Sequence, residues 1–390
     1  MSIARRGDDV MMTNYPPRPL ALVRGEGCWV WDDSGNRYLD LVAGIAVVTL
    51  GHAHPAPARA LAEQAAVLGH VSNLFWSEPA VALAERLCAL SGMERAFFCN
   101  SGAEANEAAI KLARRHGREV GGEAKHGIVS LEGAFHGRTM GALAATWGAS
   151  KKAPFEPLPA GFKQVPRDEG EALRAAVGPR TAGVLIEPIQ GEGGVNVIDG
   201  AYLALARELC DEHDALLIFD EVQTGIGRTG AWFSFLRTDV RPDVITLAKG
   251  LASGLPIGAV LSRQLATGFQ PGDHGTTYGG SPAIAAGALA TIDAVEAEDL
   301  IGNAQRMGER LVTGMRALPG VASVRGAGLM VAVELADGDS AGVAAALRER
   351  GVLVNAVTAS ALRLIPPLVI DAAQIDLAVA TLGAVLADRA

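Results

Sequence analysis

Three segments of the chain have residue types and spacing that could perform chemistry, and the first is Asn100–Ala103, with the sequence NSGA. It lies where the apolar run AFFCN turns into a predicted helix near Glu104. Free backbone amides and the helix dipole at such a turn favour an anion such as a phosphate. Ser101 and Glu104 also fit the S-x-x-E capping box. An ordinary capped turn is the commoner explanation when this segment is considered alone.

The second segment is the acidic pair Asp220 and Glu221, which follows an apolar run at 215–219. The carboxyl ends of buried strands form the edge at which α/β sheets bind ligands. An acid at that edge can keep the nitrogen of a cationic ring protonated. An exposed pair of turn residues would be the more frequent explanation without other evidence.

The third segment places Lys249 between Ala248 and Gly250, directly after the apolar run 244–247. A lysine among small residues at a strand end can form a Schiff base, because burial and nearby cations lower its pKa. Most single lysines are only solvated. An anion cradle, an acid for a ring nitrogen and an amine nucleophile are, however, the three groups that pyridoxal phosphate requires.

Two other patterns indicate different chemistry more weakly. Gly225–Gly230, GIGRTG, matches the GxGxxG pattern of dinucleotide sites, but the aromatic segment AWFSF follows it instead of an amphipathic helix. A nicotinamide-dependent oxidoreductase therefore remains an alternative that this motif supports poorly. His52 and His54 have no third ligand nearby, so we expect no metal site.

Composition restricts the class of protein. The chain has 390 residues, of which 49% are hydrophobic and 20% charged, and its net charge is −9. These values indicate a globular protein, and the absence of a Lys/Arg-rich block argues against nucleic-acid binding. Four scattered cysteines suggest reduced thiols. The amino terminus has no apolar signal core, and Leu41–Leu50 is too short to cross a membrane, so we expect a cytoplasmic protein.

Apolar runs alternate with helical stretches such as Glu104–His116 and Gly200–Asp214, which predicts an α/β fold. From about Pro282 the pattern changes to a smaller α+β unit. We predict an N-terminal segment (1–55) that packs with a C-terminal small domain (286–390), and a large domain between them (56–285). The predicted strands of the large domain are Ala96–Cys99, Gly127–Leu131, Gly183–Glu187, Ala215–Asp220, Asp243–Leu247 and Ile257–Leu261.

The motifs resemble those of the class III pyridoxal-phosphate-dependent aminotransferases, and within them the acetylornithine aminotransferases. Similar segments extend from about Pro19 to the end of the chain, and the most specific are NSGAEANE, GAFHGRT, EPIQGEGG, DEVQTGIGRTG, TLAKGL, HGTTYGG and LRLIPP. The resemblance implies an aspartate-aminotransferase-like fold of type I, with a mostly parallel seven-stranded sheet in the large domain. It also implies a homodimer with the active site at the interface.

The resemblance assigns cofactor contacts residue by residue. Lys249 would carry pyridoxal 5′-phosphate as a Schiff base and shuttle a proton. Asp220 would pair with the pyridine nitrogen, and Phe135 would lie over the ring. Thr277 would reach the phosphate of the neighbouring subunit's cofactor. The remaining implied cofactor contacts are Ser101, Gly102, Ala103, Glu221, Val222 and Gln223.

Substrate contacts are implied in the same way. Arg138 resembles an arginine that grips a carboxylate bidentately, and Thr276 resembles a residue that contacts acetylornithine. Glu192 would pair with Arg363 while the amino donor binds and would release it to the α-carboxylate of glutamate or 2-oxoglutarate. Leaving such an arginine buried without a partner would be costly, so this exchange is physically reasonable.

The implied reaction transfers the δ-amino group of N2-acetyl-L-ornithine to 2-oxoglutarate, giving N-acetyl-L-glutamate 5-semialdehyde and L-glutamate, a step of arginine biosynthesis. Succinylornithine, succinyldiaminopimelate, ornithine and 4-aminobutyrate are alternative donors. The segment Ser72–Phe75 is closer to acetylornithine enzymes than to ornithine enzymes. Two departures are Gly279–Pro282, GGSP, where GGNP is frequent, and eleven residues before Met12 that resemble an extension. A binding protein without a cofactor is the remaining class of alternative.

Overall fold

The computed structural model describes residues 2–265 and 268–389. Its largest element is a seven-stranded sheet in the order β4-β12-β11-β10-β7-β5-β6. All neighbours in this sheet are parallel except those of β12, which is antiparallel to β11 and β4. The predicted mostly parallel seven-stranded sheet is thus confirmed. In sheet order the strands are Arg95–Cys99, Gly258–Ser262, Val244–Leu247, Leu216–Asp220, Thr181–Ile186, Gly127–Leu131 and Phe162–Val165.

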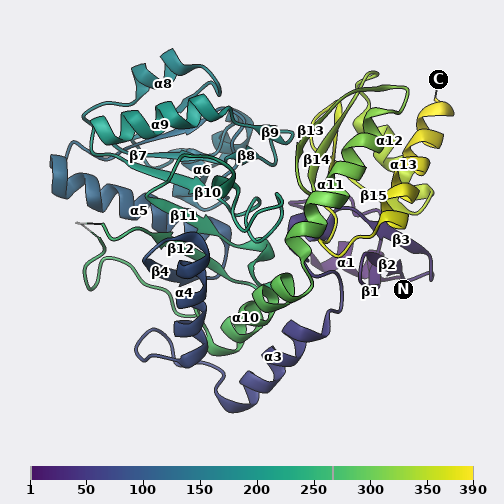
Figure 1. The fold of residues 1–390 in the computed structure, drawn as a ribbon, viewed down its shortest axis with the longest axis horizontal. Helices are drawn as coiled ribbons and strands as arrows, with labels where there is room; N and C mark the ends of the chain where they lie inside the picture. The colour runs from purple at the N-terminus through teal and green to yellow at the C-terminus, as the bar shows by residue number, and fades with distance from the viewer. Residues whose placement is uncertain (1, 266–267, 390) are drawn as a thin grey trace.

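Helices cover both faces of this sheet (Figure 1). Alternate residues of a strand enter different apolar clusters, because successive side chains point to opposite faces. Leu217 and Phe219 of β10 pack in the cluster that contains residues of α9 (Gly200–Glu212). Ile218 packs in the cluster that contains residues of α5 (Gly102–Gly121). Burial on both faces explains why these strands read as continuous apolar runs.

Two smaller sheets lie to one side of the large sheet (Figure 1). One has the order β13-β14-β17-β16, formed by Val321–Ala327, Met330–Leu335, Ala361–Leu364 and Asn355–Ala356. The other has the order β1-β2-β3-β15, formed by Leu22–Glu26, Trp29–Asp32, Arg37–Asp40 and Val352–Leu353. Because β3 pairs with β15 in parallel, the N-terminal strands are hydrogen-bonded to the C-terminal part of the chain.

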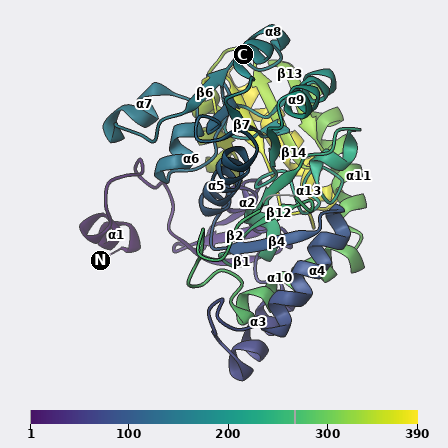
Figure 2. The same ribbon diagram turned by 90° about the vertical axis from the view of Figure 1, so that its left-hand side faces the viewer.

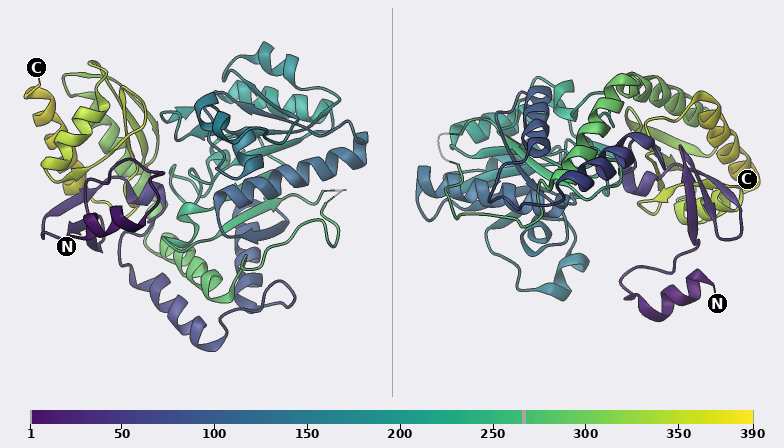
Figure 3. Two further views of the ribbon diagram at one scale, coloured as in Figure 1. Left: turned by 180° about the vertical axis from the view of Figure 1, so that it is seen from behind. Right: turned by 90° about the horizontal axis from the view of Figure 1, so that it is seen from below.

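The remaining helices connect and cover these sheets. Helix α10 (Pro282–Ala297) packs against α3 (Pro55–Val67) and α4 (Glu78–Ser91), and α11 (Leu300–Arg316) continues towards the smaller sheets (Figure 3). Helices α12 (Ser340–Glu349) and α13 (Ala372–Ala387) complete that region. The short elements are α2 (Ala43–Ala46), α6 (Met140–Ala145), α7 (Ala149–Lys152), α8 (Gly170–Ala176), η1 (Ala153–Phe155), η2 (Ser234–Arg237), η3 (Lys249–Ala252), β8 (Ile189–Gln190) and β9 (Asn196–Val197).

The N-terminal extension forms a helix, α1 (Ile3–Val10), that has no buried residue. It projects away from the rest of the molecule (Figure 2). Within residues 2–265 and 268–389, no helix combines the length and apolar composition that crossing a membrane requires. The same residues contain no cluster of three or more side chains that could hold a metal ion.

Candidate active site

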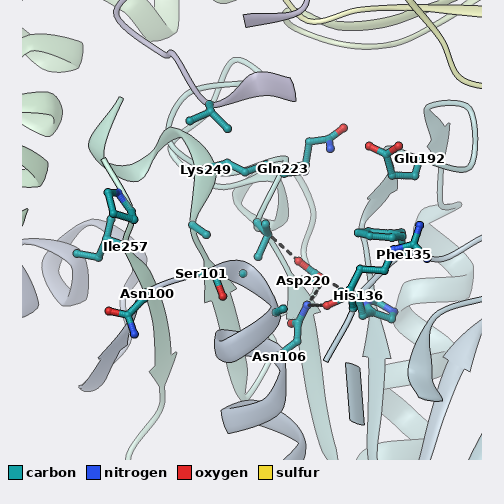
Figure 4. Close-up of a pocket in the computed structure, with 18 of the residues that line it drawn as sticks. Asn100, Ser101, Asn106, Phe135, His136, Glu192, Asp220, Gln223, Lys249 and Ile257 are labelled. Atoms are coloured by element: carbon teal, nitrogen blue, oxygen red, sulfur yellow. Dashed lines mark hydrogen bonds and ion pairs between the residues drawn. The ribbon is translucent and has the colours of Figure 1, made fainter. Parts of the chain in front are cut away.

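A cavity of about 410 Å³ lies at the carboxyl ends of the central strands, and residues from all three chemically interesting segments line it. Figure 4 shows how these side chains converge. The strand order explains the convergence, because β11, β10, β7 and β5 are neighbours and residues at or after the carboxyl end of each line this edge. The sequence-predicted residues that line the cavity are Ser101, Gly102, Ala103, Phe135, Arg138, Glu192, Asp220, Val222, Gln223 and Lys249.

Helix α5 supplies the anion end of the cavity. Ser101 is its N-cap, and the Ser101 hydroxyl accepts a hydrogen bond from the Glu104 amide at 3.2 Å. The first amides of a helix have no intrahelical acceptor, so those of Gly102 and Ala103 are suited to a phosphate. The predicted capping box is only half formed, because the Glu104 carboxylate accepts from the Asn100 amide at 2.6 Å rather than from Ser101.

Asp220 ends β10 and is held by a network of donors. Its Oδ2 lies 2.7 Å from Asn106 Nδ2 and 2.8 Å from His136 Nδ1, and its Oδ1 accepts from the Val222 amide at 3.1 Å. Thr246 is 3.4 Å from the same Oδ1. These contacts orient the carboxylate within the cavity, where Asp220 is 4% exposed.

Asn106 and His136 were not identified from the sequence as site residues. Asn106 is buried one turn into α5, and its amide also donates to the His136 carbonyl at 2.7 Å. His136 Nε2 is buried and has no hydrogen-bond partner among the described residues. The available sequence signal was the position of His136 directly after Phe135 in GAFHG.

Lys249 follows β11 and begins η3. Burial lowers the pKa of its amine, although the nearby Glu192 carboxylate acts in the opposite direction. A lowered pKa increases the fraction of neutral amine, the form that attacks a carbonyl. The site therefore contains an amine suited to Schiff-base formation within the same cavity as Asp220 and the start of α5.

Glu192 and Arg363 form an ion pair in this structure, with 2.6 Å between Oε1 and Nη1. Arg363 lies on β17 and is completely buried, and its guanidinium also donates to Gln223 at 3.1 Å and to Asn355 at 2.5 Å. Burial acts to raise the pKa of Glu192, but Arg363, Lys249 and Gln223 together outweigh it, so the pKa of this carboxyl is lowered. Asn355, from β16, is a further contact that the sequence did not indicate.

Arg138 lies at the exposed mouth of the cavity. Its guanidinium carbon is 5.3 Å from the centre of the Phe135 ring, within the range of a cation–π contact. The Phe135 amide donates to the carboxylate of Glu187 at 2.9 Å. Glu187 also lines the cavity and was not among the predicted site residues.

Four predicted residues do not line this cavity. Glu221 points elsewhere: its carboxylate accepts from the Phe235 amide at 2.8 Å and from the Thr224 hydroxyl. Arg363 reaches the cavity only through Glu192 and Gln223. Thr276 accepts from Asn100 Nδ2 at 3.4 Å, beside the anion end, whereas Thr277 is exposed.

The donor set fits pyridoxal phosphate. Helix amides match the phosphate, Asp220 matches a protonated pyridine nitrogen, Lys249 matches the aldehyde, and Phe135 offers a flat apolar face to the ring. The cavity volume also suits a ligand of this size plus a small substrate.

Comparison with known proteins identifies the family. A family model described as "Aminotransferase class-III" matches residues 10–386. The chain is 49% identical to the acetylornithine aminotransferase of Mycolicibacterium smegmatis, with 99% of this chain and 98% of the relative covered. It is 46% identical to the acetylornithine aminotransferase of Methanothermobacter thermautotrophicus, with 97% and 96% covered.

Among solved structures, the ornithine aminotransferase of Toxoplasma gondii superposes with a TM-score of 0.94 at 33% identity, with 99% of this chain and 94% of that chain covered. The similarity thus extends over the cavity, both smaller sheets and the large sheet. The chain belongs to the class III family of pyridoxal-phosphate-dependent aminotransferases.

Proposed function

We propose that this aminotransferase transfers the δ-amino group of N2-acetyl-L-ornithine to 2-oxoglutarate, giving N-acetyl-L-glutamate 5-semialdehyde and L-glutamate. The observation that carries the proposal is the Glu192–Arg363 pair beside Arg138 and Lys249. The pair gives one cavity two electrostatic states. The closed pair suits a donor whose chain is uncharged next to its amine, and the open pair suits a dicarboxylate acceptor. The two relatives compared in sequence are both named acetylornithine aminotransferase.

When bound, pyridoxal phosphate supplies an electron sink for the carbanion formed at the amine-bearing carbon. Side chains of this chain transfer the proton, orient the cofactor and exclude water. Lys249 Nζ would take the proton from the δ-carbon of the donor and, in the second half-reaction, would deliver a proton to the α-carbon of the product glutamate. Asp220, oriented by Asn106 and His136, holds the ring nitrogen in its protonated form. Phe135 and Val222 line the cavity and would exclude water from the cofactor ring.

Substrate selection follows from the arginines. With Arg363 neutralised by Glu192, the donor's amine-bearing chain enters without an exposed cation, and Arg138 binds its α-carboxylate. With 2-oxoglutarate, Arg363 leaves Glu192 and binds the α-carboxylate, and Arg138 binds the γ-carboxylate. Each state leaves the buried guanidinium paired, which avoids the cost of an isolated charge.

Free ornithine is the second candidate donor, because the Toxoplasma gondii ornithine aminotransferase superposes closely on this chain. The two donors differ in whether the α-nitrogen is a neutral amide or a cation. The test is the visible spectrum of the purified holoenzyme before and after N-acetylornithine is added without a keto acid. Bleaching of the yellow band supports the proposal, and ornithine and 4-aminobutyrate run in parallel rank the donors. A band that responds only to another donor would overturn the proposed substrate.

We also propose that the active form is a homodimer. Thr277 is exposed and does not line the cavity of its own chain, in keeping with a contact to a neighbouring subunit's cofactor. Leu74, Phe75 and Trp76 form an exposed apolar segment, 81%, 71% and 92% exposed. Contiguous exposed apolar side chains of this size mark contact surfaces.

A further inference from the structure

Glu187 lines the cavity but has no part in the reaction described above. It directly follows β7, which lies between β10 and β5 in the sheet. This order places Glu187 between Asp220, at the end of β10, and the loop after β5 that carries Phe135. The residue is 6% exposed, and a carboxylate so deeply buried needs hydrogen-bond partners.

The two carboxylate oxygens bind two different segments of the site. Oε2 accepts from the Phe135 amide at 2.9 Å, and Oε1 accepts from the Gly191 amide at 3.3 Å. Phe135 carries the aromatic ring of the cavity, and Gly191 immediately precedes Glu192. Glu187 therefore connects the backbone of Phe135, through two hydrogen bonds, to the turn at 191–194 that presents Glu192 to Arg363.

The turn at 191–194 is closely packed, so a displacement of one of its residues also displaces the residues in contact with it. A Cβ at Gly191 would overlap the Gln223 amide group, and one at Gly193 would lie 2.7 Å from the Gly133 carbonyl. Gln223 itself accepts from Arg363. The position of Gly191 thus influences Glu192 and Gln223, two of the three partners of the Arg363 guanidinium, the third being Asn355.

The charge on Glu187 matters for this double contact. Burial, with a smaller contribution from the nearby Asp220 carboxylate, raises the pKa of Glu187 to about 7, and His136 acts in the opposite direction. Lys249 lines the same cavity and interacts electrostatically with this carboxylate. An ionised carboxylate accepts both amides well, whereas an acid or an amide has one oxygen that accepts and one group that donates.

We propose that Glu187 is a positioning residue that fixes the Glu192 turn relative to Phe135 and thereby sets the enzyme's preference between amino donor and dicarboxylate acceptor. Loss of the Gly191 anchor would loosen Glu192 from Arg363 and leave the guanidinium more available to carboxylates. The inference rests on the proposed roles of Glu192 and Arg363.

The test is Glu187→Gln, which keeps size but can accept only one of the two amides. We expect the ratio of KM for the amino donor to KM for 2-oxoglutarate to rise about tenfold at pH 8, the equivalent of one lost hydrogen bond. The circular dichroism of the cofactor's visible band should change as well, because the backbone under Phe135 shifts. In the wild type the same ratio should rise as pH falls through about 7, and in Glu187→Gln it should not vary there.

The control is Glu107→Gln, which removes another carboxylate charge close to backbone amides but outside the cavity: a single oxygen of Glu107 accepts from the amides of both Gly141 and Ala142. This control should leave the ratio of KM values unchanged. If Glu187→Gln does not fold, Glu187→Asp keeps the charge and shortens the reach, and the same shift in the ratio is expected. A wild-type ratio and spectrum in a folded Glu187 variant would overturn the inference. All assays use an amino donor that the wild type accepts. The test of Glu187 therefore does not depend on whether that donor is acetylornithine.

Discussion

Lys249 combines burial with a backbone conformation that side-chain-bearing residues rarely adopt. Its φ is 42°, in the left-handed region, which costs about 1–2 kcal/mol for a residue other than glycine. Such strain persists only where the surrounding structure imposes it, and it is concentrated at functional sites. Here the turn of η3 carries the strain, and its effect is to turn the amine from the end of β11 into the cavity.

Replacing Lys249 with alanine should abolish transamination, with kcat falling about a thousandfold or more, because the proposed nucleophile and the proposed proton carrier are lost together. Steady-state rates with excess pyridoxal phosphate measure the effect. The matched control is Lys125→Ala, which also removes a buried lysine whose pKa burial lowers, but one whose amine binds the His213 carbonyl outside the cavity. Transamination retained in the Lys249 variant would contradict the mechanism.

The raised pKa of Glu221 should make the free energy of unfolding depend on pH. Burial raises its pKa from 4.5 to about 7, so between these pH values the folded state holds more protons than the unfolded state. The free energy of unfolding then falls as pH rises from about 4.5 to about 7 and levels off above. Glu221→Gln removes this contribution, so its stability relative to wild type should increase between pH 5 and pH 8 by on the order of 1–3 kcal/mol. Denaturant unfolding at both pH values measures the change, and equal differences at the two would contradict it.

The central residues of the site could be predicted because their sequence context is local. Asp220 and Lys249 each follow an apolar strand, and the chemistry of their side chains is specific. Glu187 also follows an apolar strand, yet its role depends on the fact that β7 lies between β10 and β5. Strand order is a property of long-range pairing, which a local pattern does not contain.

At the scale of elements, we expect a substitution at the start of α5 to affect both the stability of the helix and the affinity for the cofactor. Ser101→Ala removes the hydroxyl that caps α5 by accepting a hydrogen bond from the Glu104 amide. This loss should lower the free energy of unfolding by about 1 kcal/mol. It should also weaken pyridoxal phosphate binding several-fold, since the adjacent amides of Gly102 and Ala103 lose their orientation. Equilibrium dialysis of the cofactor measures this effect.

Asp199→Ala is the matched control, because Asp199 caps α9 through the Ala201 amide at 2.8 Å and does not line the cavity. It should lower stability by a similar amount and leave cofactor affinity unchanged. Equal losses of affinity in the two variants would show that the Ser101 effect is global rather than local.

The elements that sequence patterns predicted well are those buried on both faces. The six predicted strands of the large sheet all exist, with ends shifted by up to two residues. The seventh, β6 at Phe162–Val165, was not predicted, because Lys163 and Gln164 interrupt its apolar pattern at the edge of the sheet. The antiparallel direction of β12 follows from its connection to β11, since 248–257 is too short for a parallel crossover of about a dozen residues or more.

At the scale of the whole molecule, a second copy of the chain would explain why an apolar segment is left uncovered. Trp76 is 92% exposed, and Asn73 beside this segment donates to the Thr276 carbonyl at 3.2 Å. The segment and the HGTTYGG loop are thus connected. Trp76→Asp should shift the sedimentation of the protein towards a monomer, whereas Trp147→Asp, at a half-exposed tryptophan outside both segments, should not. An unchanged dimer in the Trp76 variant would show that this segment does not contribute to the interface.

A mixing experiment decides whether two chains build each active site. Lys249→Ala chains have no amine but keep Thr277, and Thr277→Ala chains keep the amine but lack the hydroxyl that is proposed to reach the neighbouring subunit's cofactor. In a mixed dimer, the site with Lys249 from one chain and Thr277 from the other is complete. Because half of randomly paired dimers are mixed and each has one complete site, activity at limiting pyridoxal phosphate should recover to about a quarter of the wild-type value. If both residues act within one chain, mixing restores nothing beyond the sum of the two parent activities, and the shared site is wrong.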